Sequence, residues 1–127
     1  MTSPEGKSAL SSPLLYKLVQ EAIWEEAQKE AFWAGSPDDL RDGFIHLSTR
    51  GQLEGTLRAH LAGERSVLVL GVDVSGPDLH WEPSRNGSLF PHWYAPLPRA
   101  SIRLIKPIPL KDGIHQVPPL PESPGPA

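Results

Sequence analysis

Apolar residues alternate with polar ones, or recur at helical spacing, along most of the chain from residue 13 to residue 112. Strands are predicted where short apolar runs are rich in branched side chains or alternate with polar residues. The predicted strands are residues 14–19, 43–48, 66–74, 79–83 and 99–110. Two helices come early and several strands follow, an order that favours a single α+β domain with an antiparallel or mixed sheet over a doubly wound parallel sheet.

The first predicted helix spans residues 21–31. Ile23, Ala27 and Ala31 recur at intervals of four residues and therefore form one stripe that faces the core. Trp24 lies beside this stripe. After the helix, the sequence GSPDD is predicted to break the chain.

The second predicted helix begins at Thr49, because a hydroxyl at the N-cap and an amide three residues later, at Gln52, match a capping box. Its predicted buried stripe consists of Leu53, Leu57 and Leu61. Gly63 stands where a C-cap glycine would end the helix. Residues 66–74 then form a near-continuous branched apolar run, which predicts a central strand covered on both faces.

The two ends of the chain differ in composition from the segment between them. Residues 1–12 are small and polar and are predicted to be a flexible leader. Residues 113–127 are predicted to be a proline-rich disordered tail. The tail contains PPLP, which matches segments that SH3- or WW-type grooves bind, although a solvated tail is the simpler interpretation.

Composition narrows the classes of function. The chain has no cysteine, which excludes disulfides, thiolate metal sites and a cysteine nucleophile and fits a cytoplasmic location. Its net charge is -3 and it has no basic stripe, which argues against a nucleic-acid partner. No apolar run is long enough to span a membrane. Glycine-rich phosphate loops, the GxSxG nucleophile motif and zinc-ligand spacings are absent, so no metal site is predicted.

A histidine interrupts the apolar run GFIHLS. In a strand, His46 shares one face with Phe44 and Ser48, so beside a cleft it would bind a ligand hydroxyl or act as a base near neutral pH. The alternative is a core histidine bonded to a backbone carbonyl. Ser48 and Thr49 also allow a structural and a functional interpretation. Each can cap the following helix, or it can form an anion-binding site with His46 at the start of that helix.

Two later segments carry further candidates. Glu82 lies opposite Trp81 in a predicted strand, where an acid either stabilises a cationic transition state or is a solvated edge residue. In FPHWYAPLP, residues 90–98, prolines are predicted to stiffen a loop that presents His92, Trp93 and Tyr94 for stacking on a flat ring. The alternative is a hydrophobic loop that covers the sheet. The other histidines receive no role.

Several motifs occur together in one order: LLYKLV, DGFIHLST, LVLGVDV, WE and FPHWYAPLP. Over about residues 14–106 this order resembles the uncharacterised bacterial DUF952 family. Ala95 stands where glycine is common in that family. The resemblance implies a fold similar to the split sheet of the ADP-ribosyltransferase superfamily, and it makes NAD the candidate cofactor.

The same resemblance implies roles for the candidate residues. His46, with Ser48 and Thr49, would contact the NAD ribose, and Glu82 would be the acid on a later strand. Trp93 or Tyr94 would stack on a ring, while His92 would orient a phosphate or act in acid–base chemistry. A non-enzymatic module that binds a small anion, a nucleotide or a protein is the alternative.

Overall fold

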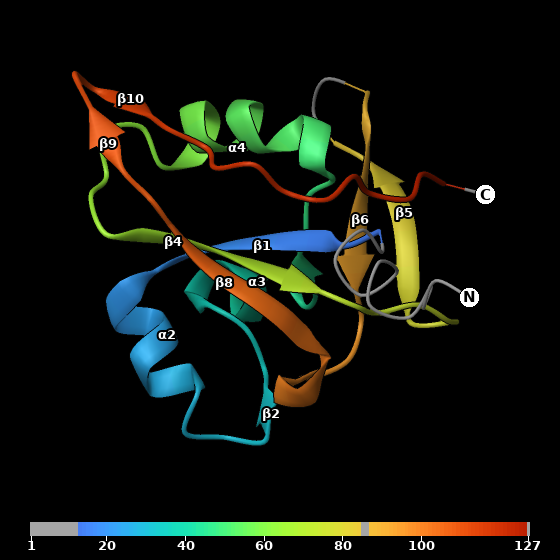
Figure 1. Cartoon of the computed structure of the whole chain (residues 1–127). Helices are drawn as coiled ribbons and strands as arrows, with labels where there is room; N and C mark the ends of the chain where they lie inside the picture. Colours follow the sequence, from blue (N-terminus) through green and yellow to red (C-terminus); the bar gives the residue numbers. More distant parts are fainter. Residues whose placement is uncertain (1–12, 85–86, 127) are drawn as a thin grey trace, which may run out of the picture.

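Two three-stranded antiparallel sheets carry most of the strand structure (Figure 1). The computed structural model describes residues 13–84 and 87–126. The first sheet has the order β1-β4-β8 and consists of β1 (Leu15–Gln20), β4 (Val67–Val72) and β8 (Ile102–Ile108). The second sheet has the order β3-β6-β5 and consists of β3 (Ile45–His46), β6 (Leu89–Trp93) and β5 (Leu79–Pro83).

Short elements complete the described part of the chain. The α-helices are α2 (Glu21–Ala27), α3 (Pro37–Asp42) and α4 (Leu53–His60). The 3-10 turns are η1 (Arg50–Gln52), before α4, and η2 (Arg99–Ser101), before β8. The two-stranded pairs are β2 (Phe32–Trp33) with β7 (Leu97–Pro98), and β9 (Leu110–Lys111) with β10 (Ile114–His115). The predicted α+β class is confirmed, whereas the likeness to ADP-ribosyltransferases stays a prediction.

The first sheet is covered on both faces, as predicted for its central strand β4. Alternate residues of β4 enter two separate apolar clusters. Leu70 packs in the cluster that contains Trp24 of α2, and Val69 packs in the cluster that contains Leu57 of α4. Figure 1 shows α2 and α4 on opposite sides of this sheet. Every residue of β4 is buried, which explains why its sequence is apolar without alternation.

The first predicted helix is shorter than its pattern suggested. α2 ends at Ala27, and Ala31 is exposed, so the stripe that was predicted to continue to residue 31 does not. The chain instead turns into β2, where Trp33 enters the core and meets Trp24 edge-on with ring centroids 6.2 Å apart. Burial of a second tryptophan therefore overrides the helical spacing.

The capping box at the second predicted helix is confirmed. The backbone N–H of Thr49 donates to the side-chain oxygen of Gln52 at 2.9 Å, and η1 leads directly into α4. The helix ends at His60 with Leu61 as its C-cap, so the prediction that Gly63 caps it was wrong. Gly63 instead adopts a left-handed conformation in the turn that follows.

The sequence GSPDD was predicted only as a break, yet it begins an additional helix, α3, between the two that were predicted. Ser36 and Asp39 form a capping box, and Pro37 occupies the first turn. Gly43 ends the helix with a φ of 86°, a left-handed C-cap that favours glycine. These signals are those of a helix start and stop, with only six helical residues between them.

Residues 90–98 were predicted to be a rigid loop, and this was wrong, because residues 89–93 form β6, the middle strand of the second sheet. Proline is rare in the middle strand of a sheet, because it has no backbone N–H to donate to a neighbouring strand. The carbonyl of Pro91 accepts a hydrogen bond from the N–H of Leu47 at 3.1 Å. In an antiparallel strand, the backbone N and O of one residue point toward the same neighbouring strand. The nitrogen of Pro91 therefore points toward the end of β3, and its lack of a hydrogen removes no hydrogen bond to β5.

The chain after β10 packs against the protein, which contradicts the prediction of a disordered tail from residue 113. The N–H of Leu14 donates to the carbonyl of Glu122 at 3.1 Å. The hydroxyl of the buried Tyr16 donates to the carbonyl of Pro121. The tail therefore lies along the start of β1.

Two apolar side chains of this tail, Val117 and Leu120, pack against the cluster under α4. They stand among prolines without helical or strand spacing, so periodicity did not reveal them. The predicted leader, residues 1–12, lies outside the described residues. None of the helices in the described ranges is long and apolar enough to cross a membrane.

Candidate functional site

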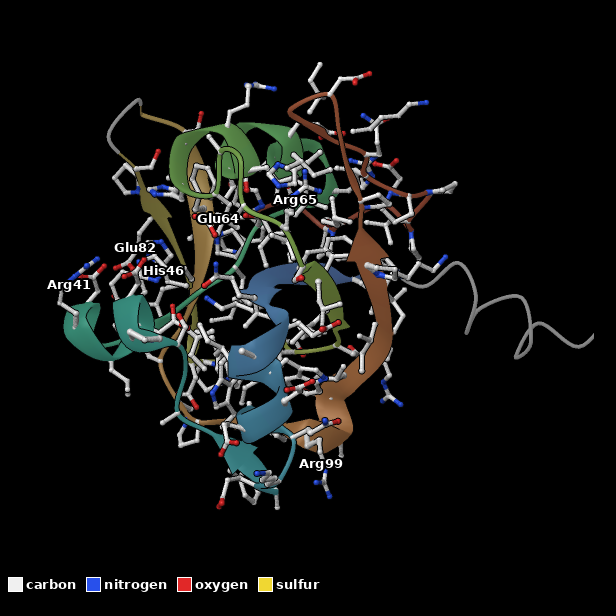
Figure 2. All side chains as sticks on the ribbon, turned by 90° about the vertical axis from the view of Figure 1, so that its left-hand side faces the viewer. Arg41, His46, Glu64, Arg65, Glu82 and Arg99 are labelled. Atoms are coloured by element: carbon white, nitrogen blue, oxygen red, sulfur yellow. The ribbon has the colours of Figure 1, made fainter. Side chains whose placement is uncertain are left out.

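The second sheet has two unlike faces. Its inner face packs Ile45 and Trp93 into the apolar cluster beneath the first sheet. His92 of the middle strand pairs in register with His46 of β3 and with His80 of β5. The outer face therefore carries aromatic and ionisable side chains at alternate positions, among them Phe44, His46, His80, Glu82, His92 and Tyr94. Figure 2 shows Glu82 and His46 on one side of the molecule.

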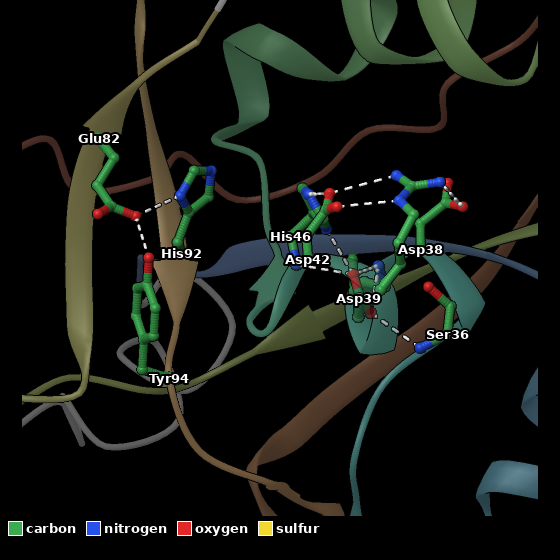
Figure 3. A network of polar contacts seen from close by, with 10 residues as sticks. Ser36, Asp38, Asp39, Asp42, His46, Glu82, His92 and Tyr94 are labelled. Carbon is green, nitrogen blue, oxygen red and sulfur yellow. Dashed lines mark hydrogen bonds and ion pairs between the residues drawn. The ribbon is translucent and has the colours of Figure 1, made fainter.

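Two donors of the outer face meet at one oxygen, Oε1 of Glu82 (Figure 3). Nδ1 of His92 lies 2.6 Å from it, and the hydroxyl of Tyr94 donates to it at 2.7 Å. The hydrogen bonds from Tyr94 and His92 hold the pKa of Glu82 below its usual value, and the bond to Glu82 raises the pKa of Tyr94. Glu82 is therefore a carboxylate at neutral pH. Because a carboxylate only accepts hydrogen bonds, Nδ1 of His92 carries the proton.

The other ring nitrogen of His92, Nε2, has no hydrogen-bond partner among the described residues. Every buried side-chain nitrogen or oxygen in the same residues has a partner, so Nε2 is accessible to solvent. The side chain as a whole is only 12% exposed, because the ring of Phe44 stacks on it with centroids 4.1 Å apart. With the proton on Nδ1, Nε2 carries a lone pair, which is the arrangement of a general base held by a carboxylate.

His46 has both ring nitrogens engaged by carboxylates. Nδ1 lies 2.7 Å from Oδ1 of Asp39, and Nε2 lies 3.0 Å from Oδ2 of Asp42. Since carboxylates accept only, an imidazolium that donates from both nitrogens satisfies this arrangement. His46 has no nitrogen left to take a proton from a ligand, and His92 is the better placed base.

Asp39 connects three elements through one buried carboxylate, 1% exposed. It lies 3.0 and 2.9 Å from Nζ of Lys17 on β1, and it accepts from the backbone N–H groups of Ser36 at 2.9 Å and His46 at 3.0 Å. Burial by itself would raise the pKa of Asp39, but the hydrogen bonds from His46 and the charge of Lys17 outweigh it and hold this pKa well below its usual range. Burial lowers the pKa of Lys17, and Asp39 opposes that effect.

Phe44 connects the two histidine groups. Its ring centroid is 4.1 Å from that of His92, 4.6 Å from that of His46 and 5.2 Å from that of Tyr94. Tyr94 also meets the exposed His80 edge-on at 4.8 Å. Three rings around one phenylalanine, with His80 beside Tyr94, make an aromatic surface that suits a flat ligand ring.

Three predicted site residues do not lie on the outer face. Trp93 is on the inner face, 8% exposed, and its indole N–H donates to the carbonyl of Pro96 at 3.3 Å. Ser48 is 4% exposed and shares a 3.1 Å hydrogen bond with Thr56 of α4. Thr49 forms the capping box described above. The structure brings together the other four predicted residues, which are His46, Glu82, His92 and Tyr94.

At the start of the second predicted helix, where an anion-binding site was predicted, a side chain of the tail takes the place of the anion. The first backbone N–H of η1, on Arg50, donates to the hydroxyl of Ser123 at 2.7 Å. That hydroxyl in turn donates to the carbonyl of Leu14. The tail therefore supplies the acceptor that an anion would have provided.

A shallow hollow of about 270 Å³ adjoins the outer face. The β3–β6 ladder ends at Ile45 and Trp93, and the chain before it turns at Gly43 into α3, so the two strands separate there. The hollow is lined mainly by apolar residues, namely Ala34, Leu40, Phe44, Ile45, Trp93, Tyr94, Ala95 and Pro96, together with Asp39 and Gly43. Phe44 and Tyr94 therefore belong both to the hollow and to the outer face, although the histidines and Glu82 do not line it.

Lys17, Asp39 and Asp42 were not among the predicted site residues. The capping box of α3 was a signal for Asp39, but a capping acid usually faces solvent, and nothing in the sequence indicated that Lys17 would be buried against it. Within the described residues, no group of three or more His, Cys, Asp or Glu side chains is arranged to hold a metal ion.

Comparison with known proteins places the chain among relatives. The sequence model of a family described as "Protein of unknown function (DUF952)" matches residues 18–105. The crystal structure of protein CC0527 from Caulobacter crescentus is 38% identical, with a TM-score of 0.76, and the match covers 81% of this chain and 93% of that one. The solution NMR structure of CC0527 gives a TM-score of 0.73 over 81% and 91% of the two chains. No curated protein matches the chain.

Proposed function

The chain belongs to the DUF952 family of proteins of unknown function, and we propose that it is an enzyme that binds a nucleotide and uses the His92–Glu82 pair as its general base. The ligand class is a molecule with a flat ring, hydroxyl groups and phosphate, of which NAD is the first candidate. The observation that carries the proposal is the free Nε2 of His92, next to an Nδ1 held 2.6 Å from a carboxylate.

With NAD as the substrate, the reaction is cleavage of the nicotinamide–ribose bond. Nε2 of His92 takes a proton from water or from an acceptor hydroxyl, whose oxygen forms a bond to C1′ of the ribose. The bond from C1′ to the nicotinamide nitrogen breaks, and its electron pair neutralises the ring, so nicotinamide leaves without needing a proton. Glu82 stabilises the imidazolium that forms on His92.

The aromatic surface and the hollow support a ligand with one flat ring at this position. A cavity of about 150 Å³ is enough for a ring the size of benzene. The hollow of about 270 Å³ is therefore large enough for one ring, yet below the roughly 300–1,000 Å³ of pockets that enclose a whole ligand. Most of a dinucleotide would lie across the outer face, with one ring in the hollow between Leu40 and Tyr94.

The predicted likeness to ADP-ribosyltransferases is the reason to test NAD first, but a fold does not by itself specify a reaction. The roles differ from those the resemblance implied. His46 is occupied by two carboxylates, and Glu82 acts through His92 rather than directly on the ribose.

The test is an assay for nicotinamide released from NAD by the purified protein. His92→Gln removes the base and is expected to lower the rate by about 100-fold or more. His60→Gln, on the exposed surface of α4, is the matched control and is expected to leave the rate unchanged. Full activity of the His92→Gln variant would overturn the assignment of the base.

A non-enzymatic binding module is the second candidate. It is favoured by one observation, that both nitrogens of His46 are already paired within the protein. This candidate predicts saturable NAD binding that raises the melting temperature without release of nicotinamide.

A further inference from the structure

Asp42, the last residue of α3, holds its carboxylate between two side chains that normally bind anions (Figure 3). Nε of Arg41 lies 2.9 Å from Oδ1, and Nη2 of Arg41 lies 3.3 Å from Oδ2. Nε2 of His46 lies 3.0 Å from the same Oδ2. The carboxylate thus receives the two-pronged contact of a guanidinium and a third donor from an imidazole.

We propose that Arg41 and His46 form a binding site for a phosphate or carboxylate group of the ligand, and that the Asp42 carboxylate occupies this site until the ligand displaces it. The inference rests on the proposed function only in placing the anion on the same molecule that His92 acts on. A carboxylate of the protein and an anion of the ligand accept the same hydrogen bonds from the same donors.

The site lies beside the proposed base. The ring centroids of His46 and His92 are 5.7 Å apart, and Phe44 contacts both rings. β3, which carries His46, pairs with β6, which carries His92. Figure 3 shows Asp42 beside His46, and Glu82 beside His92. An anion bound to Nε2 of His46 would therefore fix one end of a ligand whose reacting atom lies near Nε2 of His92.

The two carboxylates on His46 differ in how easily they can be displaced. Asp39 has a fully buried side chain and stays bound to Lys17 and to backbone N–H groups, so it keeps the imidazole in place. The Asp42 side chain is 34% exposed and its Arg41 partner is 67% exposed. Exposed ion pairs contribute little to stability, and a negative charge at the C-terminal end of a helix is unfavourable. Asp42 can therefore move away while Asp39 remains.

Asp38 provides a matched control. It also pairs with Arg41, at 3.3 Å, and it lies on the same helix, but no contact joins it to His46 in the described structure. Asp38→Asn and Asp42→Asn change the net charge equally and both release Arg41 from one carboxylate. Only Asp42→Asn also frees His46 from a charged competitor.

The experiment is a titration of the full chain with inorganic phosphate and with acetate at constant pH and ionic strength, followed by NMR. Asp42→Asn is expected to bind phosphate about tenfold more tightly than the wild type, with the largest shifts at Arg41 and His46. Asp38→Asn is expected to resemble the wild type. In the double variant Asp42→Asn, His46→Gln the gain in affinity is expected to disappear.

Equal phosphate affinity of the Asp42→Asn and Asp38→Asn variants would overturn the proposal, and so would a gain that survives His46→Gln. A melting temperature close to that of the wild type checks that each variant is folded. Because this titration uses simple anions and leaves His92 unchanged, its failure is distinct from a failure of the nicotinamide-release assay.

Discussion

At the scale of single residues, Asp39 shows how one buried acid determines the position of a functional side chain. Four donor groups from Lys17, Ser36 and His46 surround its carboxylate, and no solvent contact is left to it. The backbone and the ring of His46 bind the same oxygen, so both the start of β3 and the orientation of the imidazole depend on α3. Asp39 is a positioning residue in this site.

Asp39→Asn is expected to lower the free energy of unfolding at neutral pH by about 3–5 kcal/mol, because it leaves the buried Lys17 without a counter-charge. Urea denaturation at pH 7 measures this loss. Asp38→Asn, at a side chain 68% exposed, is the control and should change stability by about 1 kcal/mol or less. Equal effects of the two substitutions would contradict the central place of Asp39.

The pKa of Asp39 also predicts a response to acid. Its folded-state pKa lies below the usual value of about 3.9, so its contribution to stability is complete above that pH and is lost as the pH falls toward the folded-state value. The wild type should lose stability steeply below about pH 4, and Asp39→Asn should lose less over the same interval. Urea midpoints at several acidic pH values measure the difference, and parallel curves for the two proteins would contradict it.

Tyr16 gives the opposite pH dependence. Burial raises its pKa to about 12, so its contribution to stability is complete below the ordinary value of about 10 and is lost as the pH rises from there toward 12. The chain has two tyrosines, and in a Tyr94→Phe variant the ultraviolet absorbance of tyrosinate reports Tyr16 alone. The folded variant should titrate near pH 12 and the urea-unfolded variant near 10. A midpoint near 10 in the folded variant would show that Tyr16 is not buried as described.

At the scale of elements, β4 was predicted correctly because its sequence fits only a strand that is buried on both faces. A run of branched apolar residues without alternation requires burial on both faces, and two clusters provide it. β5 was predicted from its alternation, and its face assignment placed Glu82 opposite Trp81 as found. Local pattern was sufficient for these strands because each one is regular over five or six residues.

α3 and β6 could not be assigned by the same periodicity. α3 is six residues long, too short for a stripe, although its capping box and its terminal glycine were visible. β6 contains Pro91, and a middle strand tolerates it only because the missing donor faces the end of a two-residue strand. The length and position of β3 decide whether Pro91 is tolerated, and residues 90–98 alone contain no information about β3. Four residues of the site were therefore predicted from the sequence, but its position between α3 and β6 was not.

Gly71 in β4 lies where neighbouring side chains leave no room for a Cβ atom. A Cβ at this position would lie 2.7 Å from Cγ of Leu104 on β8 and 2.9 Å from Cδ1 of Leu14. Gly71→Ala is therefore expected to destabilise the protein by about 1–3 kcal/mol. Gly55→Ala, on the exposed side of α4 with only Arg58 within 4 Å, should instead stabilise it by about 0.4–1 kcal/mol. Denaturant unfolding of both variants checks the signs, and a neutral Gly71→Ala would mean that β8 lies farther from β4.

At the scale of the whole molecule, the C-terminal tail bonds both to the start of the first sheet and to the turn that begins the helix after the GFIHLS segment. Ser123 accepts from Arg50 at the start of η1 and donates to Leu14 before β1, while Tyr16 donates to Pro121. The tail therefore fixes the first helix turn after the GFIHLS segment against the first sheet. Its order was not predictable from composition, because each contact joins residues far apart in sequence.

Deletion of residues 116–127 is expected to lower the free energy of unfolding by about 2–4 kcal/mol, because it exposes the cluster that Val117 and Leu120 cover and removes the acceptor for Tyr16. A deletion that begins at Pro124 keeps these contacts and is the control. Chemical denaturation measures both. Equal stability of the two truncated proteins would contradict a structural role of the tail.

A long-range ¹H–¹⁵N spectrum of the histidine rings during a titration with NAD shows whether His92 is a base held by Glu82, with its other nitrogen open to a ligand. We expect neutral His92 to carry its proton on Nδ1, Glu82→Gln to weaken this preference, and the Nε2 resonance to move when NAD binds. A proton on Nε2 of neutral His92, or an Nε2 resonance that NAD, ADP-ribose and nicotinamide all leave unchanged, would contradict this expectation.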